Sequence, residues 1–122
     1  MTTQQIADRL VELCRIGQSD TAYRELFAQD ASSHEMPGVP GGSAHGLEAI
    51  LAKAEAWDKD VEEIMRFEAT DPLVYGHLFS VGMGIQLKKK DGTTTPFEQE
   101  ICVYETRDGK IVSERFIYSM PG

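Results

Sequence analysis

The sequence predicts an α+β fold in which three N-terminal helices cover one face of a curved antiparallel sheet. Three observations lead to this prediction. Apolar residues recur at helical spacing as far as Trp57, they alternate with polar residues from Val61 onward, and several glycines interrupt the alternating half. Because glycines inside a strand favour a bend, the sheet is expected to curve around the helices and leave a conical cavity for a small molecule.

Periodic apolar residues predict helices over residues 6–14, 21–28 and 47–57. Gly17 is expected to end the first helix, and Ser19 or Asp20 to cap the second. The third helix begins after Gly46 and keeps apolar side chains along one face as far as Trp57. All three helices are amphipathic, so each is expected to pack against the sheet.

The second half of the chain is expected to form four strands, over residues 61–69, 73–87, 97–105 and 110–120. The turns between them are expected at Asp71-Pro72, Asp91-Gly92 and Arg107-Asp108-Gly109. The second strand carries Tyr75 and His77 among its alternating apolar residues. This side of the strand is therefore expected to face the helices.

The composition is typical of one soluble globular domain over residues 1–122. Hydrophobic residues make up 41% of the chain and charged residues 26%. The formal net charge of −8 argues against a nucleic-acid-binding surface, and no apolar run approaches the ~20 residues of a transmembrane helix. The two cysteines lack disulfide-framework spacing and the N-terminus does not resemble a signal peptide, so a cytoplasmic protein is expected.

The chain resembles a known group of proteins in three stretches, ELFAQDASSHEMPG, HGLEAI and YETRDGKIVSERFIY. In this order and spacing they resemble the SnoaL-like branch of the nuclear transport factor 2-like superfamily, which also includes ketosteroid isomerases and polyketide cyclases. The resemblance extends from Ile6 to Met120. It implies a cystatin-like cone of three helices and a curved antiparallel sheet, and it implies a homodimer, since superfamily members frequently pair through their sheets.

The resemblance to ketosteroid isomerases concerns three catalytic positions. Their base lies four residues after the last alanine of a shared LFA-D-A element, a position that falls on Glu35 here. Their oxyanion-hole aspartate falls on Cys102 or Ile101, and their hydroxyl-donating tyrosine falls near Leu10. Only the base position keeps a titratable group, so steroid isomerisation by that mechanism is not expected.

The candidate catalytic residues are Glu35, His77 and Glu100. Beside apolar Met36, the carboxylate of Glu35 could move a proton on carbon next to a carbonyl, or it could be a solvated acid before a loop. His77 is expected to point inward, either as a functional partner or as a hydrogen-bonded core histidine. Glu100 shares a strand face with Cys102, and the sequence leaves open whether this face points inward.

His34 and Glu35 are adjacent in an extended segment, so their side chains are expected to point to opposite faces. The resemblance places the isomerase base on Glu35, which implies that Glu35 faces the cavity and His34 faces outward. Because the two side chains point to opposite faces, His34 and Glu35 are not expected to bind one metal ion together. Neither a metal nor another cofactor is expected.

A small apolar ligand is the expected occupant of the cavity, because aromatic side chains suit a flat apolar molecule. The residues expected to line the core or the cavity are Tyr23, Phe27, Met36, Trp57, Tyr75, Cys102 and Tyr118. Their helical or strand spacing makes them core residues first and ligand contacts second.

Two functions remain open from the sequence. The first is acid–base catalysis of the isomerase, cyclase or hydrolase type on a small apolar carbonyl compound, with Glu35 as base. The second is a non-catalytic module that binds a small ligand or dimerises. A homodimer is expected to form sheet to sheet, through a face on which Gly76, Gly82 and Gly84 let another backbone approach.

Overall fold

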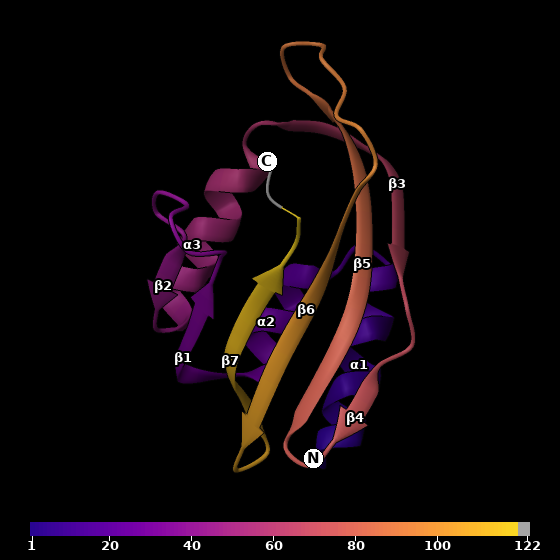
Figure 1. The fold of residues 1–122 in the computed structure, drawn as a ribbon. Coiled ribbons are helices and arrows are strands. Elements are labelled where there is room, and N and C mark those ends of the chain that lie inside the picture. Colours follow the sequence, from indigo (N-terminus) through magenta and orange to yellow (C-terminus); the bar gives the residue numbers. More distant parts are fainter. Residues whose placement is uncertain (120–122) are drawn as a thin grey trace.

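The computed structural model describes residues 1–119 and shows three helices against one face of a curved, seven-stranded sheet, which confirms the predicted α+β fold (Figure 1). The helices are α1 (Thr3–Arg15), α2 (Ser19–Leu26) and α3 (Leu47–Asp58). The strands are β1 (Phe27–His34), β2 (Ser43–His45), β3 (Val61–Ala69), β4 (Leu73–Tyr75), β5 (Leu78–Lys89), β6 (Glu98–Arg107) and β7 (Lys110–Ile117). The sequence predicts a last strand that reaches Met120, a residue outside the described range.

The three helices form where the apolar periodicity places them. A capping box between Thr2 and Gln5 begins α1, and Gly46, with a φ of 91°, precedes α3. α2 ends two residues earlier than predicted, because Phe27 adopts extended backbone angles and begins β1. None of the helices within residues 1–119 is long and apolar enough to cross a membrane.

The sheet is mixed, whereas the sequence predicts a wholly antiparallel one. Its strands run in the order β2-β1-β7-β6-β5-β3, and β4 pairs with β5. Neighbouring strands are antiparallel except β1 and β7, which are parallel. Parallel neighbours need a long connection, and here α3 and the strands β2 to β6 supply it. A pairing between such distant segments leaves no local signal in the sequence.

The predicted strand over residues 73–87 is instead a hairpin of β4 and β5. Tyr75 pairs with Leu78 across a two-residue turn at Gly76 and His77, and Gly76 has the positive φ (63°) that favours such turns. The turn places Tyr75 on the outer face, where it is 87% exposed, and leaves His77 exposed at the tip. The predictions that His77 points inward and that Tyr75 lines a cavity are therefore wrong.

The glycines of β5 face neighbours from the same chain. A Cβ atom at Gly84 would lie within 3 Å of the Phe97 ring, and one at Gly82 would lie 3.1 Å from the Thr70 side chain. Arg66 stacks on the same ring, with its guanidinium carbon 4.0 Å from the centroid. These two glycines therefore accommodate the chain's own side chains, and they do not provide the open backbone surface that the sequence suggests.

The hydrophobic core lies between the helices and one half of the sheet. Phe79 and Tyr104 stack there with 4.7 Å between their ring centroids, and both are almost fully buried. Along the same inner face burial decreases, because β3, β5 and β6 extend beyond α1 and α2 (Figure 1). We name this less covered region the open end of the sheet; its half-buried inward residues are Met83, Ile85, Glu100, Phe116 and Tyr118.

Candidate functional site

Three glutamates from different parts of the chain meet one lysine where the core gives way to the open end. Glu35 directly follows β1, Glu100 lies on β6 and Glu114 lies on β7. Lys53 extends from α3, the helix that packs on β1 and β2. Their charges influence one another: Lys53 and Glu100 both affect the pKa of Glu114, and Glu35 affects that of Glu100. We name these four residues the carboxyl cluster.

Glu35 lies on the inner side of the fold, where the sequence places it. Its Oε2 accepts a hydrogen bond from the Tyr118 hydroxyl at 3.1 Å, and its Oε1 lies 3.4 Å from Lys53 Nζ. The Gly42 carbonyl accepts hydrogen bonds from both the Glu35 backbone N–H and Lys53 Nζ. With 23% of its side chain exposed, Glu35 is held by two partners and still reaches solvent.

His34 points away from the carboxyl cluster. Its ring contacts the hydroxyls of Ser32 at 3.0 Å and Ser43 at 3.4 Å, and it packs edge-on against His45. Partial burial lowers the pKa of His34 below its ordinary value, so the ring is neutral at pH 7. The opposite directions predicted for His34 and Glu35 are therefore observed.

Glu100 lies on the inward face of β6, which settles the alternative that the sequence leaves open. It pairs with Met83 of β5, and Cys102, two residues further on, is fully buried. Burial raises the pKa of Glu100, and the negative charge of Glu35 raises it further. The Cys102 thiol opposes this shift by donating a hydrogen bond to Glu100 Oε1 at 3.5 Å. Neighbouring carboxyls with separated pKa values can divide acid and base roles.

Glu114 is the most deeply buried member of the carboxyl cluster, with 2% of its surface exposed. Its Oε1 accepts a hydrogen bond from Ser33 Oγ at 2.8 Å, and the Tyr23 hydroxyl lies 3.2 and 3.3 Å from its two oxygens. Burial raises the pKa of Glu114 to about 7, although both hydroxyls favour the charged form. The candidates drawn from the sequence do not include this residue.

A bulge in β7 explains why the sequence conceals Glu114. Successive residues of β6 pair with Ile111 and Ser113, so Val112 is an extra residue in β7. The bulge turns Ile111 and Glu114 to the same inward face, whereas regular alternation would place them on opposite faces. The available signal is the odd spacing of apolar Ile111 and Phe116, which a regular strand cannot direct to one face.

Lys53 is the second cluster residue that sequence reasoning missed. Its Nζ lies 5.6 Å from the Phe116 ring centroid as well as beside Glu35. Within residues 1–119 no other Lys or Arg forms an ion pair with a glutamate of the carboxyl cluster. The signal in the sequence is a lysine on the apolar face of α3, three residues after buried Ile50.

The other sequence-based candidates divide between the carboxyl cluster and the surface. Tyr23, Cys102 and Tyr118 contact the cluster as described, and buried Phe27 lies 4.8 Å from the Tyr23 ring. Met36 is half-buried in the loop after β1, whereas Trp57 is 48% exposed near the end of α3. Within the described part of the chain, no group of three or more His, Cys, Asp or Glu side chains is arranged to hold a metal ion.

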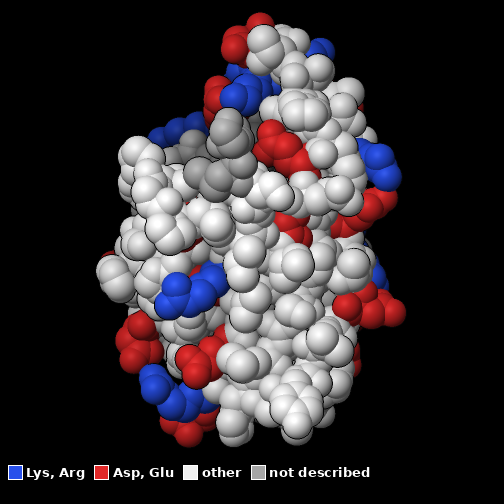
Figure 2. All heavy atoms as spheres, in the orientation of Figure 1, with Lys and Arg blue, Asp and Glu red and all other residues white. Residues whose placement is uncertain are grey.

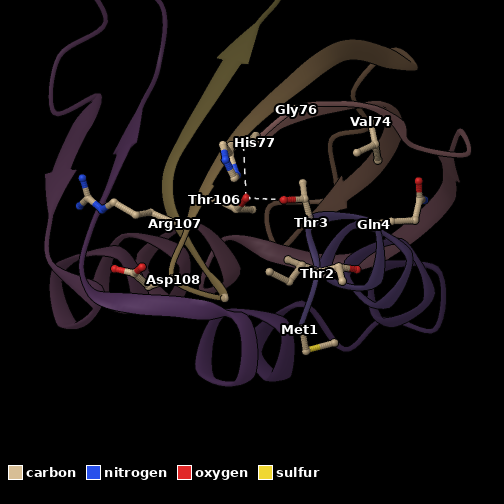
Figure 3. A pocket seen from close by; sticks show the side chains of 12 residues that line it. Met1, Thr2, Thr3, Gln4, Val74, Gly76, His77, Thr106, Arg107 and Asp108 are labelled. Atoms are coloured by element: carbon tan, nitrogen blue, oxygen red, sulfur yellow. Dashed lines mark hydrogen bonds between the residues drawn. The ribbon is translucent and has the colours of Figure 1, made fainter.

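His77 borders a surface hollow at the other end of the sheet (Figure 3). This hollow of about 440 Å³ lies between the first residues of α1 and the turns that join β4 to β5 and β6 to β7. The Thr106 hydroxyl contacts the Thr3 hydroxyl at 2.7 Å and donates to the His77 carbonyl at 3.3 Å. Because Thr106 and Glu100 are six residues apart on β6, the hollow lies ~20 Å from Glu100 along the strand. His77 cannot assist Glu35 from there.

The chain is similar to one domain family and to many solved structures. The sequence model of the SnoaL-like domain family matches residues 1–118. A comparison with curated proteins gave no match. A proposed SnoaL-like polyketide cyclase from Mesorhizobium loti, also labelled a carbohydrate phosphatase, is 29% identical with a TM-score of 0.89. The superposition covers 97% of this chain and 100% of that one.

Two more distant structures share the fold. One is a protein from Catenulispora acidiphila with a ketosteroid isomerase-like fold in complex with trimethylamine; it is 19% identical, with a TM-score of 0.74 and coverage of 98% and 88%. The other is a protein from Xanthomonas campestris with a cystatin-like fold; it is 19% identical, with a TM-score of 0.76 and coverage of 98% and 92%. The match over residues 1–118 shows that this chain belongs to the SnoaL-like domain family, and these two structures share its cystatin-like, α+β cone.

Proposed function

We propose that this protein is a cofactor-independent acid–base catalyst, of the isomerase or cyclase type, for a small and largely apolar carbonyl compound. Glu35 takes a proton from the carbon next to the carbonyl and returns it to the product. Lys53 and Tyr118, which both contact Glu35, donate hydrogen bonds to the carbonyl oxygen as it becomes negative. Glu100, in its protonated form, is the further polarising partner.

The observation that carries this proposal is that the charge of Lys53 acts on three carboxyl groups, by an ion pair with Glu35 and at longer range on Glu100 and Glu114. Lys53 forms an ion pair with Glu35, with 3.4 Å between Lys53 Nζ and Glu35 Oε1. Burial raises the pKa of Glu100 and of Glu114, so these two groups hold their protons more tightly than ordinary glutamates. The carboxyl cluster therefore combines a carboxyl group paired with a cation and two carboxyl groups with raised pKa values, a combination that supports proton transfer.

The open end of the sheet is the proposed ligand surface. Its inward side chains Met83, Ile85 and Phe116 are apolar and half-buried, and they lie on the strands that carry Glu100 and Glu114 or on their neighbours. An apolar compound placed there would have its carbonyl oxygen near the carboxyl cluster. Membership of a family with a small-molecule-binding cone, and the trimethylamine complex of the Catenulispora acidiphila protein, support a small ligand.

The proposed catalysis can be tested with 2-tetralone, an aromatic ketone with exchangeable protons next to its carbonyl. In D2O the protein is expected to accelerate the exchange of these protons above the buffer rate, as followed by proton NMR. Lys53→Met should slow the protein-dependent exchange about 100-fold, because it removes one donor to the developing negative oxygen. Lys59→Met, at the exposed C-cap of α3, is the control and should leave the exchange unchanged.

A different result with 2-tetralone would favour the other function left open by the sequence. Shifts of amide signals around Glu35 and Lys53 without any exchange would contradict catalysis on this ketone. They would support a non-catalytic module that binds small ligands at the open end. Equal exchange rates for the wild type and Lys53→Met would exclude Lys53 as the donor.

We also propose that two copies of the chain pair through the outer face of the sheet. Leu78, Ile101 and Ile117 lie on this face and are each about half exposed, and Ile101 and Ile117 are cross-strand neighbours. Figure 2 shows largely uncharged atoms over the lower parts of β5 and β6, with many charged side chains toward the margins. Apolar patches of this kind frequently mark interfaces between proteins.

The dimer can be tested by light scattering of the protein at micromolar concentration. The wild type is expected to have twice the mass of the 13.6 kDa chain, and Ile101→Lys to have the mass of one chain. Ile16→Lys, at the exposed C-cap of α1, should remain dimeric. A monomeric wild type, or a dimeric Ile101→Lys, would contradict pairing through this face.

A further inference from the structure

Glu114 is a buried carboxyl to which the proposed mechanism assigns no step. We propose that Glu114 is a positioning residue: on the acid side of neutral pH it holds a proton and thereby leaves the charge of Lys53 to Glu35. The inference rests on the function proposed above, because it states how the carboxyl cluster shares one cation. It is supported by the partners of Glu114 and by the groups that surround it.

The partners of Glu114 are hydroxyl groups, which suit both protonation states. Ser33 Oγ is 2.8 Å from Oε1, and the Tyr23 hydroxyl is within 3.3 Å of both oxygens. A hydroxyl can donate or accept a hydrogen bond. Both groups donate to ionised Glu114, whereas protonated Glu114 can donate to Tyr23 while Ser33 still donates to its other oxygen. The site therefore allows Glu114 to gain or lose a proton without rearrangement of the strands.

Glu35 has partners of a different kind. The Lys53 ammonium can only donate hydrogen bonds, and its positive charge favours the ionised carboxylate. Glu35 also keeps 23% of its side chain in contact with solvent, whereas Glu114 is 2% exposed. Glu35 therefore has a cation and solvent beside it, whereas burial penalises an ionised form of Glu114.

Among residues 1–119, Lys53 is the one cation that acts on the pKa of Glu114. The titratable groups that act on it or on its hydroxyl partner are Cys14 of α1, Tyr23 of α2, Lys53 of α3, and Glu100, Cys102 and Tyr104 of β6. Burial raises the pKa values of the thiols and phenols, so these groups are neutral at pH 7. Lys53 forms its ion pair with Glu35 and lies outside ion-pairing distance of Glu114. Within the described part of the chain, a second ionised carboxylate of the cluster would have no ion-pair partner.

Carbon NMR of the glutamate carboxyls over a range of pH tests this inference without any ligand. The Glu114 signal, assigned by its loss in Glu114→Gln, is expected to titrate at about pH 7. The same substitution should move the Glu100 titration to lower pH, because two coupled carboxyls affect each other reciprocally. Ser33→Ala removes a donor to the charged form and should raise the Glu114 midpoint by about one unit. Glu62→Gln, exposed on β3, should change neither titration.

The pH dependence of the 2-tetralone exchange rate distinguishes a positioning role of Glu114 from a purely structural one, because a structural role would not change this dependence. The protein-dependent rate should fall above pH 7 in the wild type, as Glu114 ionises and competes for Lys53. In Glu114→Gln the rate should not fall over this range. A Glu114 carboxyl that is already ionised at pH 5 would overturn the inference, as would a Glu100 titration unchanged by Glu114→Gln.

The inference and the proposed catalysis can fail separately. If the expected titrations are seen in a protein without exchange activity, the proposed catalysis is refuted and the inference about Glu114 is supported. Exchange activity in a protein whose Glu114 is ionised at pH 5 would support the catalysis and refute the inference about Glu114. Ser33→Ala retains the carboxyl and therefore tests the inference by a second route. An unshifted Glu114 titration in Ser33→Ala would count against it.

Discussion

Glu114→Gln is expected to raise the free energy of unfolding by about 3 kcal/mol at pH 8 and to leave it nearly unchanged at pH 4. Glutamine has almost the shape of glutamate, and its amide can still bond the hydroxyls of Tyr23 and Ser33. It cannot ionise. The substitution therefore removes the unfavourable burial of a charge and keeps most of the packing and hydrogen bonding.

The pH dependence follows from the pKa of Glu114 in the two states. Burial raises this pKa from 4.5 to about 7 in the folded protein. Below pH 4.5 the group is protonated in both states and has no effect on stability. Between pH 4.5 and 7 the unfolded chain loses the proton while the folded protein keeps it, so stability falls as pH rises. Above pH 7 the loss is complete, and its size corresponds to about 3 kcal/mol.

Urea unfolding at pH 4, 6 and 8, followed by the fluorescence of Trp57, measures this effect. Carboxyls remote from Glu114 contribute equally to both proteins and cancel in the difference. Glu62→Gln is the matched control on an exposed strand and should follow the wild type at every pH. A loss of stability of the same size at all three pH values would show that the lost hydrogen bonds outweigh the charge, and it would contradict the prediction.

The parts of the fold that the sequence predicts are those with local causes. The periodic apolar residues of α1 and α3, the turn at Asp91-Gly92 and the turn around Gly109 each depend on residues close together in the chain. The parallel pairing of β1 with β7 depends on segments about 80 residues apart. Its register therefore follows from the packed fold and has no sequence pattern of its own.

Two local features were misread because strand alternation continued through them. The turn at Gly76 and His77 interrupts an apolar alternation that otherwise predicts one strand, and only the positive φ of Gly76 reveals it. The bulge at Val112 reverses the alternation of β7 and turns Glu114 inward. A prediction from alternation assumes that successive side chains point to opposite faces throughout a strand, and a turn or a bulge interrupts this alternation. The turn therefore makes the inward prediction for His77 wrong, and the bulge explains why Glu114 is not among the candidates.

The candidate site was predicted in part. Glu35 was found through a resemblance that placed a catalytic base at its position, and Glu100 through its strand, with its face left open. Lys53 and Glu114 were missed, because the sequence alone does not show that a lysine of α3 and a glutamate of β7 approach the same carboxylates. A cluster formed from four distant elements requires the tertiary structure. The role of Glu35 as base stays a prediction.

Glu35→Gln is expected to reduce the protein-dependent exchange of 2-tetralone about 1,000-fold. Glutamine can keep the hydrogen bond from Tyr118 and the same side-chain volume, but its amide does not accept a proton from carbon. Exchange of the ketone in D2O, measured by proton NMR at pH 6.5, gives the rate for the wild type and the variant. Glu62→Gln, with the same chemical change on exposed β3, should retain the full rate.

The stability of Glu35→Gln should change little. The ion pair between Glu35 and Lys53 is partly exposed, at 23% and 28% of the two side chains, and pairs of this kind contribute about 0–1 kcal/mol. Lys53 also keeps its hydrogen bond to the Gly42 carbonyl at 3.2 Å. A large loss of exchange with an almost unchanged unfolding free energy would therefore locate the effect in the chemistry and not in the fold.

The pair Glu35 and Lys53 is expected to act as a unit, which the double variant can show. If Glu35 takes the proton while Lys53 stabilises the oxygen of the same enolate, removing the base leaves little enolate for the lysine to stabilise. Glu35→Gln combined with Lys53→Met should therefore be hardly slower than Glu35→Gln alone. Fully multiplicative losses would mean that the two residues act on separate steps. If Glu35→Gln keeps the full exchange rate and Glu100→Gln loses it, the base is Glu100 on β6 and not Glu35.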